Sequence, residues 1–168
     1  MGTLVNGLPN VYGTILEAAS EFPEMQMVLS VGRNFNPDDL GRIPSNTIVV
    51  RTAPQIDLLK RAALCITHAG LNTALEALAQ GVPMVAILVG FDQPGVAARI
   101  AYHGVGEFIE VGNLTTRRLS QLIAKIRENP KYRDKAGWFR KVLEAARQAA
   151  WLFSKMRALA LRRAILRR

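Results

Sequence analysis

Short apolar runs of strand length alternate with segments of helical spacing along most of this 168-residue chain. The apolar runs lie at 25–31, 47–50, 63–67, 83–89 and 107–111, of which 83–89 is expected to be a buried strand. The helical segments lie at 11–22, 57–62, 71–80, 94–103 and 115–129, the last with Thr115 as its expected cap. Strands that alternate with helices predict an α/β fold, a Rossmann-like parallel sheet with flanking helices. Ligands of such sheets bind at the carboxyl ends of the strands, so polar residues that directly follow the apolar runs are candidate site residues.

Positive charge is concentrated in the last part of the chain. Residues 131–168 contain 12 Lys or Arg and two acidic residues, whereas residues 1–130 contain 10 and 11. We therefore predict a Rossmann-like domain over 1–130 and a long, basic, amphipathic helical extension over 131–168. Few aromatic residues are interleaved with these charges and no nucleic-acid motif is present, which argues against a nucleic-acid partner.

Two readings of this extension remain open. Apolar residues recur along it at intervals of three and four, from Phe139 to Ala160. Its first part can pack on the domain while the rest is a solvated end, or the helix can contact an anionic membrane surface.

The remaining composition indicates a cytoplasmic protein, with the inner membrane face as the alternative location. The single cysteine, Cys65, lies in an apolar run, which is typical of a buried, reduced thiol. The N-terminus lacks an export signal, and the longest apolar run, 82–91, is too short to cross a bilayer.

The polar residues of 67–76 have the chemistry of an anion site. His68 follows a predicted strand, Gly70 permits a tight turn, and Asn72 and Thr73 open a helix whose free N–H groups carry partial positive charge. A diphosphate fits there. Glu76, one turn further on, can accept hydrogen bonds from paired hydroxyls such as those of ribose.

A second polar pair, Asp92 and Gln93, follows the next predicted strand. An acid beside an amide suits the hydroxyls of a neutral sugar. Each of these residues alone is more often structural, as a helix cap or a histidine at the end of a strand. Their order over about forty residues, each at the ligand end of a strand, favours a nucleotide-sugar site.

Other chemistries have less support. The sequence has no phosphate loop of the type GxxxxGK[ST], and no GxGxxG after a strand. His68 and His103 are the only histidines and neither has neighbouring Cys or His, so we expect no metal and no cofactor beyond the donor substrate.

The motif resembles the donor-binding signature of a known family. The run Ala53-Pro54-Gln55, Thr67 to Thr73, Glu76, Gly81-Val82-Pro83 and Asp92-Gln93-Pro94 is similar to that of the UDP-glycosyltransferases, whose GT-B fold has two facing Rossmann-like domains. The bacterial macrolide and zeaxanthin glucosyltransferases are most alike. The signature covers 52–99, and similarity extends from Gly2 to about Arg127.

The resemblance implies roles for the site residues. Gln55 and Glu76 would hold the ribose, and His68, Asn72 and Thr73 the diphosphate. Asp92 and Gln93 would hold the sugar. Thr3, in a glycine-hydroxyl loop, would face the β-phosphate. The plant enzymes have Trp where Thr52 stands, so the resemblance does not fix which nucleotide base is bound. Residues 88–91 replace the polar residues that usually precede the acid-amide pair, so it does not fix which sugar is bound.

The resemblance also implies an incomplete enzyme. Family members carry an N-terminal domain that binds the acceptor and supplies the catalytic base of inverting transfer, so we expect no catalytic residue in this chain and no activity from it alone. The family's first strand, near the middle of the sheet, is also missing, so we predict an incomplete sheet or an unpaired strand edge.

Two functions remain open. The chain is either the UDP-sugar-binding part of a hexosyltransferase, with UDP-glucose as the leading donor and a small, lipophilic acceptor, or a noncatalytic remnant or interaction subunit of a split enzyme.

Overall fold

The computed structural model describes the backbone of residues 9–90 and 93–165, with side chains for residues 10–90 and 93–155. Two predicted site residues, Thr3 and Asp92, lie outside the described residues. The elements follow one another as α1 (Pro9–Ser20), β1 (Met27–Ser30), η1 (Pro37–Leu40), β2 (Thr47–Val50), α2 (Gln55–Leu59), β3 (Cys65–Thr67), α3 (Leu71–Ala79), β4 (Met84–Leu88), α4 (Gln93–Tyr102), β5 (Gly106–Glu110), η2 (Val111–Asn113), α5 (Thr116–Glu128) and α6 (Pro130–Ile165).

The described strands form two separate parallel sheets. β1 pairs with β2, with Val28 opposite Ile48, and β3, β4 and β5 form a second sheet with β4 in the middle. Within the described residues no strand joins β1 to β3. The predicted α/β fold with parallel strands is confirmed, and among the described residues the sheet is open.

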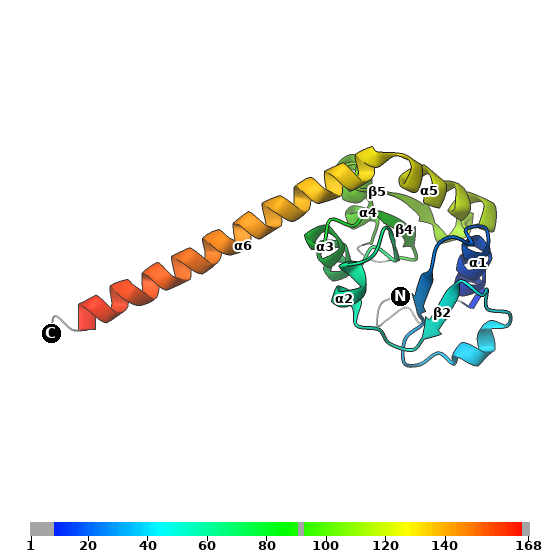
Figure 1. Cartoon of the computed structure of the whole chain (residues 1–168), viewed down its shortest axis with the longest axis horizontal. Coiled ribbons are helices and arrows are strands. Elements are labelled where there is room, and N and C mark those ends of the chain that lie inside the picture. The colour runs from blue at the N-terminus through cyan, green and yellow to red at the C-terminus, as the bar shows by residue number, and fades with distance from the viewer. Residues whose placement is uncertain (1–8, 91–92, 166–168) are drawn as a thin grey trace.

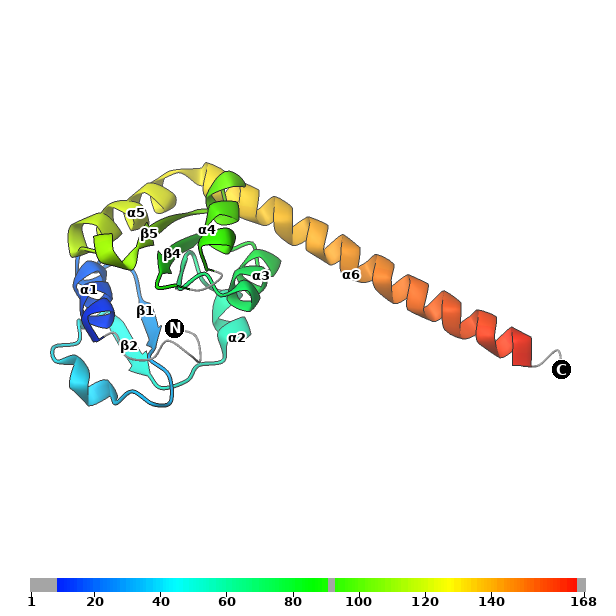
Figure 2. The ribbon, with the colours of Figure 1, turned by 180° about the vertical axis from the view of Figure 1, so that it is seen from behind.

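Helices cover both faces of the three-stranded sheet, so that β4 is buried throughout. Its odd-numbered residues Val85 and Ile87 join a core cluster with α1, α5, β1 and β5, whereas its even-numbered residues join a second cluster with α3, α4 and the start of α6. Figure 1 and Figure 2 show α1 beside α5 at one end of the domain, and α3 and α4 near the base of α6. A strand buried on both faces is continuously apolar, which is the pattern of residues 84–88.

Specific residues account for the close approach of these elements. A Cβ on Gly106 would lie 2.1 Å from the carbonyl oxygen of Met84, so only glycine fits where β5 pairs with β4. The amide Nδ2 of Asn46 donates to the carbonyl oxygens of Ala19, Phe22 and Met25 at 2.9–3.0 Å, which holds the end of α1 against the start of β2.

Helix α5 begins as predicted, because the hydroxyl of Thr115 accepts from the backbone N–H of Arg118 at 3.3 Å. A small polar cluster joins this helix to β5 and α6. Lys125 Nζ donates to Glu107 Oε1 at 2.6 Å and the Tyr132 hydroxyl donates to the same oxygen. Desolvation acts to raise the pKa of Glu107, but the hydrogen bonds from Lys125 and Tyr132 outweigh it and leave this pKa lowered.

The predicted and observed elements differ at a few ends. α2 covers 55–59 and not 57–62, because Pro54 precedes it and the Pro54 carbonyl accepts from Leu58 N–H at 3.1 Å, which starts the helix two residues earlier. The two short helices η1 and η2 have no apolar periodicity, and the pattern did not predict them.

The predicted extension is one helix of 36 residues, α6. Its first turns belong to the core, where Tyr132 and Ala136 are buried, and from there it projects away from the domain (Figure 1). Exposed aromatic and aliphatic side chains lie along it, among them Trp151, Leu152 and Phe153. No helix in the described part of the chain is both long and apolar enough to cross a membrane.

Candidate functional site

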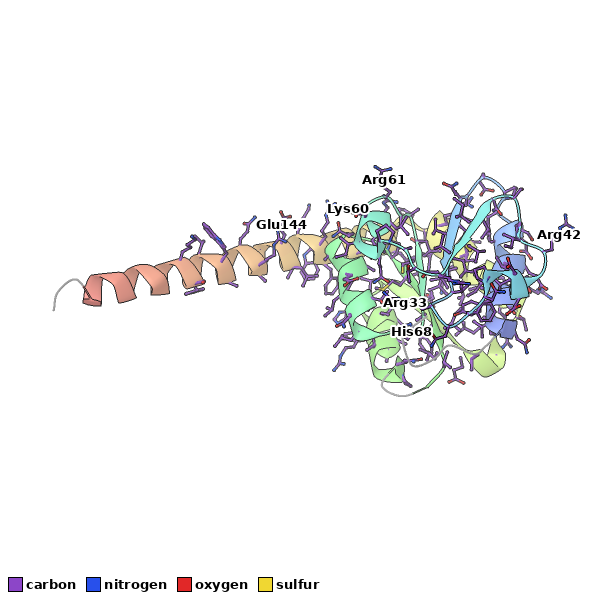
Figure 3. All side chains as sticks on the ribbon, turned by 90° about the horizontal axis from the view of Figure 1, so that it is seen from below. Arg33, Arg42, Lys60, Arg61, His68 and Glu144 are labelled. Carbon is purple, nitrogen blue, oxygen red and sulfur yellow. The ribbon has the colours of Figure 1, made fainter. Side chains whose placement is uncertain are left out.

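The loop between β3 and α3 is the most constrained part of the predicted site. His68 directly follows β3, and its imidazole folds back over Gly70, where a Cβ would lie 2.6 Å from Nε2 and 2.9 Å from Cε1. Gly70 therefore allows the ring to lie over the helix start. Figure 3 shows His68 on the domain, away from Glu144 on α6.

Ala69, between these two residues, adopts a left-handed backbone conformation with φ of +61° and is fully buried. A non-glycine residue there is strained, by about 1–2 kcal/mol, and such strain gathers at functional sites. Ala69 lies within the family signature, but the sequence does not predict its left-handed backbone, because alanine rarely adopts this conformation. The turn aims the His68 side chain and the first N–H groups of α3 at the same region.

The start of α3 is electrostatically suited to an anion. Gly70 is its N-cap and provides no side-chain cap, and the first turn contains no acidic residue. Asn72 is exposed and Thr73 is half-buried at the second and third helical positions. The N–H groups of the first turn and the positive end of the helix dipole are therefore available to a ligand such as a diphosphate.

Gln55, Thr73 and Glu76 form a hydrogen-bonded group beside this helix start. Gln55 Nε2 donates to Glu76 Oε2 at 2.5 Å and lies 3.4 Å from Thr73 Oγ1. Gln55 is the first residue of α2, and the contact joins two helices across 21 residues of sequence. The carboxylate of Glu76 is thereby held in place, and it has further lone pairs that can accept from hydroxyl groups.

The structure buries Gln93, whereas the sequence pattern predicts an exposed side chain that contacts the sugar. It is 3% exposed, and its Oε1 accepts from the backbone N–H groups of Val89 and Gly90 at 2.8 and 3.1 Å. The side chain therefore fixes the loop after β4. A sugar contact from Gln93 would have to use its Nε2 group, and the sugar role predicted for Gln93 and for Asp92 stays a prediction.

The structure thus brings most of the described site residues together at one end of α3. Two groups lie along its first two turns, the imidazole over Gly70 and the Gln55–Thr73–Glu76 group. The hydroxyl of Thr67, which precedes His68, is buried with no hydrogen-bond partner among the described residues. Thr67 is part of the family signature, but sequence reasoning gave it no role in the site, since a threonine that ends a strand has no distinguishing signal.

Other features of the fold lie apart from this site. An open groove of about 530 Å³ lies at the opposite end of α3, where Gln80 and Gly81 face α6, and it shares no residue with the predicted site. The apolar surroundings of Cys65 raise the pKa of its thiol to about 11, which makes it a poor nucleophile. Within 9–90 and 93–155, no three His, Cys, Asp or Glu side chains gather as metal ligands would.

Comparison with known proteins places this geometry in a family. The family model described as "UDP-glucoronosyl and UDP-glucosyl transferase" matches residues 1–144. An uncharacterized UDP-glucosyltransferase of Bacillus subtilis, YojK, is 35% identical over 146 residues, which are 87% of this chain and 36% of YojK. The zeaxanthin glucosyltransferase of Pantoea ananas is 38% identical over 109 residues, which are 64% of this chain and 25% of that protein.

Solved structures agree with these relatives. The glycotransferase of kitacinnamycin superposes with a TM-score of 0.81 at 30% identity, covering 92% of this chain and 41% of that protein. Os79 from O. sativa in complex with UDP has a TM-score of 0.74 at 21% identity, covering 83% of this chain and 34% of Os79, and it supports the fold alone. The chain spans about a third of the length of its first curated relatives.

Proposed function

Because the chain belongs to the UDP-glucuronosyl and UDP-glucosyl transferase family, we propose that it is the donor-binding part of an inverting glycosyltransferase. It takes a UDP-sugar, with UDP-glucose as the first candidate, and serves transfer of the hexose to a small, lipophilic acceptor. One observation carries the proposal: the His68 imidazole lies over the uncapped start of α3, and Gln55 holds the carboxylate of Glu76 on the second turn of the same helix.

His68 and the first turn of α3 hold the diphosphate. As the bond from the anomeric carbon to the diphosphate breaks, negative charge grows on the leaving oxygen, and groups already aimed at that position stabilise the transition state. Backbone N–H groups of the helix start, the Asn72 amide, the Thr73 hydroxyl and the imidazole are donors of this kind. We assign no metal to this step, because these donors and the helix dipole supply the positive potential.

The ribose binds beside them. Glu76 accepts hydrogen bonds from the ribose hydroxyls, and Gln55 keeps the carboxylate in position through the 2.5 Å contact with Oε2. A carboxylate held by a second side chain loses little conformational freedom when the ligand binds. Thr3 and Asp92 complete the proposed site on the β-phosphate and the sugar.

The general base for the acceptor hydroxyl is not assigned to this chain. His68 lies at the leaving group, His103 packs edge-on against Tyr102 and Phe139, and the Cys65 thiol is protonated at neutral pH. We propose that an acceptor-binding domain or subunit supplies the base, so that this chain alone binds donor without turnover.

Calorimetric titration of the full chain with UDP and UDP-glucose tests the donor site. Saturable binding that is lost in His68→Ala and in Glu76→Ala supports the proposal, and unchanged binding with EDTA supports the absence of a metal. His103→Ala and Glu144→Ala are matched controls that remove the same groups elsewhere. A folded chain that binds neither nucleotide would instead be a noncatalytic remnant or interaction subunit.

We propose in addition that α6 places the protein at the cytoplasmic face of a membrane. Trp151, Leu152 and Phe153 are 59, 55 and 72% exposed on a part of α6 that projects from the domain, and Lys155 lies 5.6 Å from the Trp151 ring centre. Exposed aromatic side chains next to basic ones favour an anionic lipid surface. Sedimentation with anionic vesicles, with and without residues 151–168, tests this contact, and equal pelleting of both forms would refute it.

A further inference from the structure

The groove at the end of α3 is a second concave surface that the proposed function does not use. Gln80 and Gly81 form one wall, and α6 residues between 133 and 141 form the other. Its volume of about 530 Å³ is comparable to that of ligand sites, which measure about 300–1,000 Å³. The groove can therefore hold a ligand while the donor site, at the opposite end of α3, is occupied.

Three cations on this groove have no charge partner in the described part of the chain. Arg133, Arg140 and Lys141 are exposed, and none of them forms an ion pair or a side-chain hydrogen bond among the described residues. Asp134 is the acidic residue of the lining, and the end of α3 adds about −0.5 of an elementary charge. The three positive charges outweigh both, so the groove favours an anionic occupant.

An aromatic ring on the groove indicates that the occupant also has an apolar part. Trp138 is 56% exposed, and its ring packs edge-on against Phe139 with the ring centres 4.9 Å apart. Phe139 packs in turn against His103 at 5.2 Å. A ring supported in this way loses little conformational freedom when a partner covers it. Tryptophan and arginine are the residues that most often dominate the binding energy of protein interfaces, which favours a polypeptide partner.

A glycine inside α6 is not explained by the packing of the described residues. A Cβ on Gly137 would meet no described atom within 4 Å, yet glycine in a helix interior is less stable than alanine. Gly137 lines the groove four residues after Arg133 and four residues before Lys141, so the three lie on one face of α6. The missing side chain leaves a gap between two cations, which a side chain of a partner can fill.

The helix sets the spacing of these two cations. Arg133 and Lys141 are eight residues apart, which is about 12 Å along the helix axis. In an extended peptide, alternate side chains point to the same side, and residues four apart are separated by about 13 Å. Two carboxylates four residues apart therefore match the two cations, and the side chain midway between them faces Gly137 beside Trp138.

We propose that this groove binds an extended acidic segment of a partner polypeptide with the pattern Glu-x-Leu-x-Glu. The two carboxylates pair with Arg133 and Lys141, and the leucine enters the gap over Gly137. Arg140 provides a third cation at the other wall, where a Cβ on Gly81 would lie 3.6 Å from its Cδ. A lipid surface or a nucleic-acid backbone has no apolar side chain between its charges, so neither fills the gap.

NMR titration of the full chain with a blocked peptide that contains Glu-Thr-Leu-Thr-Glu tests the groove. Saturable shifts are expected at the amides of Gly81 and Gly137 and at the indole of Trp138. The indole of Trp151, which is 59% exposed further along α6, is expected to stay unchanged. The same peptide with glutamine at both glutamate positions binds about fivefold more weakly. Salt at about 0.5 M weakens the acidic peptide in the same direction.

Two pairs of variants separate binding from folding. Gly137→Ala puts a methyl group into the gap, so the peptide binds about threefold more weakly although the midpoint of urea denaturation rises. Gly13→Ala in α1, where a Cβ also meets no described atom within 4 Å, raises the midpoint and leaves peptide binding unchanged. Arg133→Gln weakens binding about fivefold. Arg42→Gln leaves it unchanged, since this exposed arginine lies at the end of the domain opposite α6 (Figure 3).

Four outcomes would overturn the proposal. The first is no saturable shift at the groove, and the second is equal affinity for the acidic and the glutamine peptide. The third is wild-type peptide affinity in Gly137→Ala. The fourth is an Arg133→Gln variant that keeps peptide binding but loses sedimentation with anionic vesicles or binding of a single-stranded oligonucleotide, because the groove would then contact lipid or nucleic acid. UDP titration of the same variants is expected to match the wild type, so the groove and the donor site are tested separately.

Discussion

Gly70→Ala separates ligand binding from stability at the predicted diphosphate site. The backbone at Gly70 has φ of −62° and ψ of 131°, which alanine adopts without strain. The added Cβ would lie 2.6 Å from His68 Nε2, about 0.8 Å short of an ordinary contact at 3.4 Å. The contact is with a side chain, so the imidazole can turn away at a cost of about 0.5–1.5 kcal/mol for an unfavourable rotamer.

The expected result is a folded protein with a weakened donor site. The free energy of unfolding changes by less than about 1 kcal/mol. Alanine lowers the conformational entropy of the unfolded chain, and this stabilisation offsets the cost of turning the His68 ring away. A hydrogen bond from the imidazole to a charged phosphate contributes about 1.5–3 kcal/mol, so its loss weakens UDP binding by roughly tenfold to a hundredfold.

Calorimetry with UDP, paired with urea denaturation, measures both quantities. Gly112→Ala is the control, because a Cβ there meets nothing within 4 Å. His68→Ala and the double variant complete a double-mutant cycle. In the His68→Ala background, Gly70→Ala is expected to change the affinity for UDP little, because the imidazole is already absent. Wild-type UDP affinity in Gly70→Ala would refute the idea that the ring over the helix start binds the ligand.

Three further predictions concern the domain. Gly106→Ala places a Cβ 2.1 Å from the Met84 carbonyl oxygen and lowers the free energy of unfolding by about 3 kcal/mol or more; a loss below about 1 kcal/mol in urea denaturation would contradict the packing of β5 on β4. The lowered pKa of Glu107 stabilises the fold above pH ~4.5, and this stabilisation is lost as the pH falls through the folded-state pKa. Glu107→Gln therefore costs about 1 kcal/mol at pH 7 and less at pH 3, and a constant difference across this range would argue against the lowered pKa. The Cys65 thiol is half-buried and not fully buried as the sequence suggested, and desolvation raises its pKa to about 11, so it reacts with a thiol reagent at pH 8 more slowly in the native chain than in the unfolded chain; equal labelling rates would contradict the raised pKa.

Much of the fold was predictable because it is encoded locally. The strand at 47–50 and the cap at Thr115 were predicted from apolar spacing and from one hydroxyl, and the structure has both. The continuous apolar run at 83–89 likewise predicted a buried strand, and every residue of β4 is buried. Such features depend on residues a few positions apart, whose periodicity and hydrogen bonding act within a single element.

The candidate site was predictable as a set of residues and not as an arrangement. The order of His68, Gly70 and Glu76 along the chain indicated an anion site; the structure places His68 and Gly70 at the start of α3 and Glu76 in its second turn. The placement of Gln93 under the loop after β4 was not foreseen, because an amide side chain has the same sequence signal whether it faces a ligand or caps buried N–H groups.

By itself the sequence determined the alternation of strands and helices, the family signature and the basic extension. Only the tertiary structure decided that the imidazole folds over Gly70 and that Gln55 reaches Glu76 from another helix. The physical reason is that these features join segments far apart in the chain. Side-chain direction and strand pairing are fixed by the packing between such segments, which local propensity does not specify.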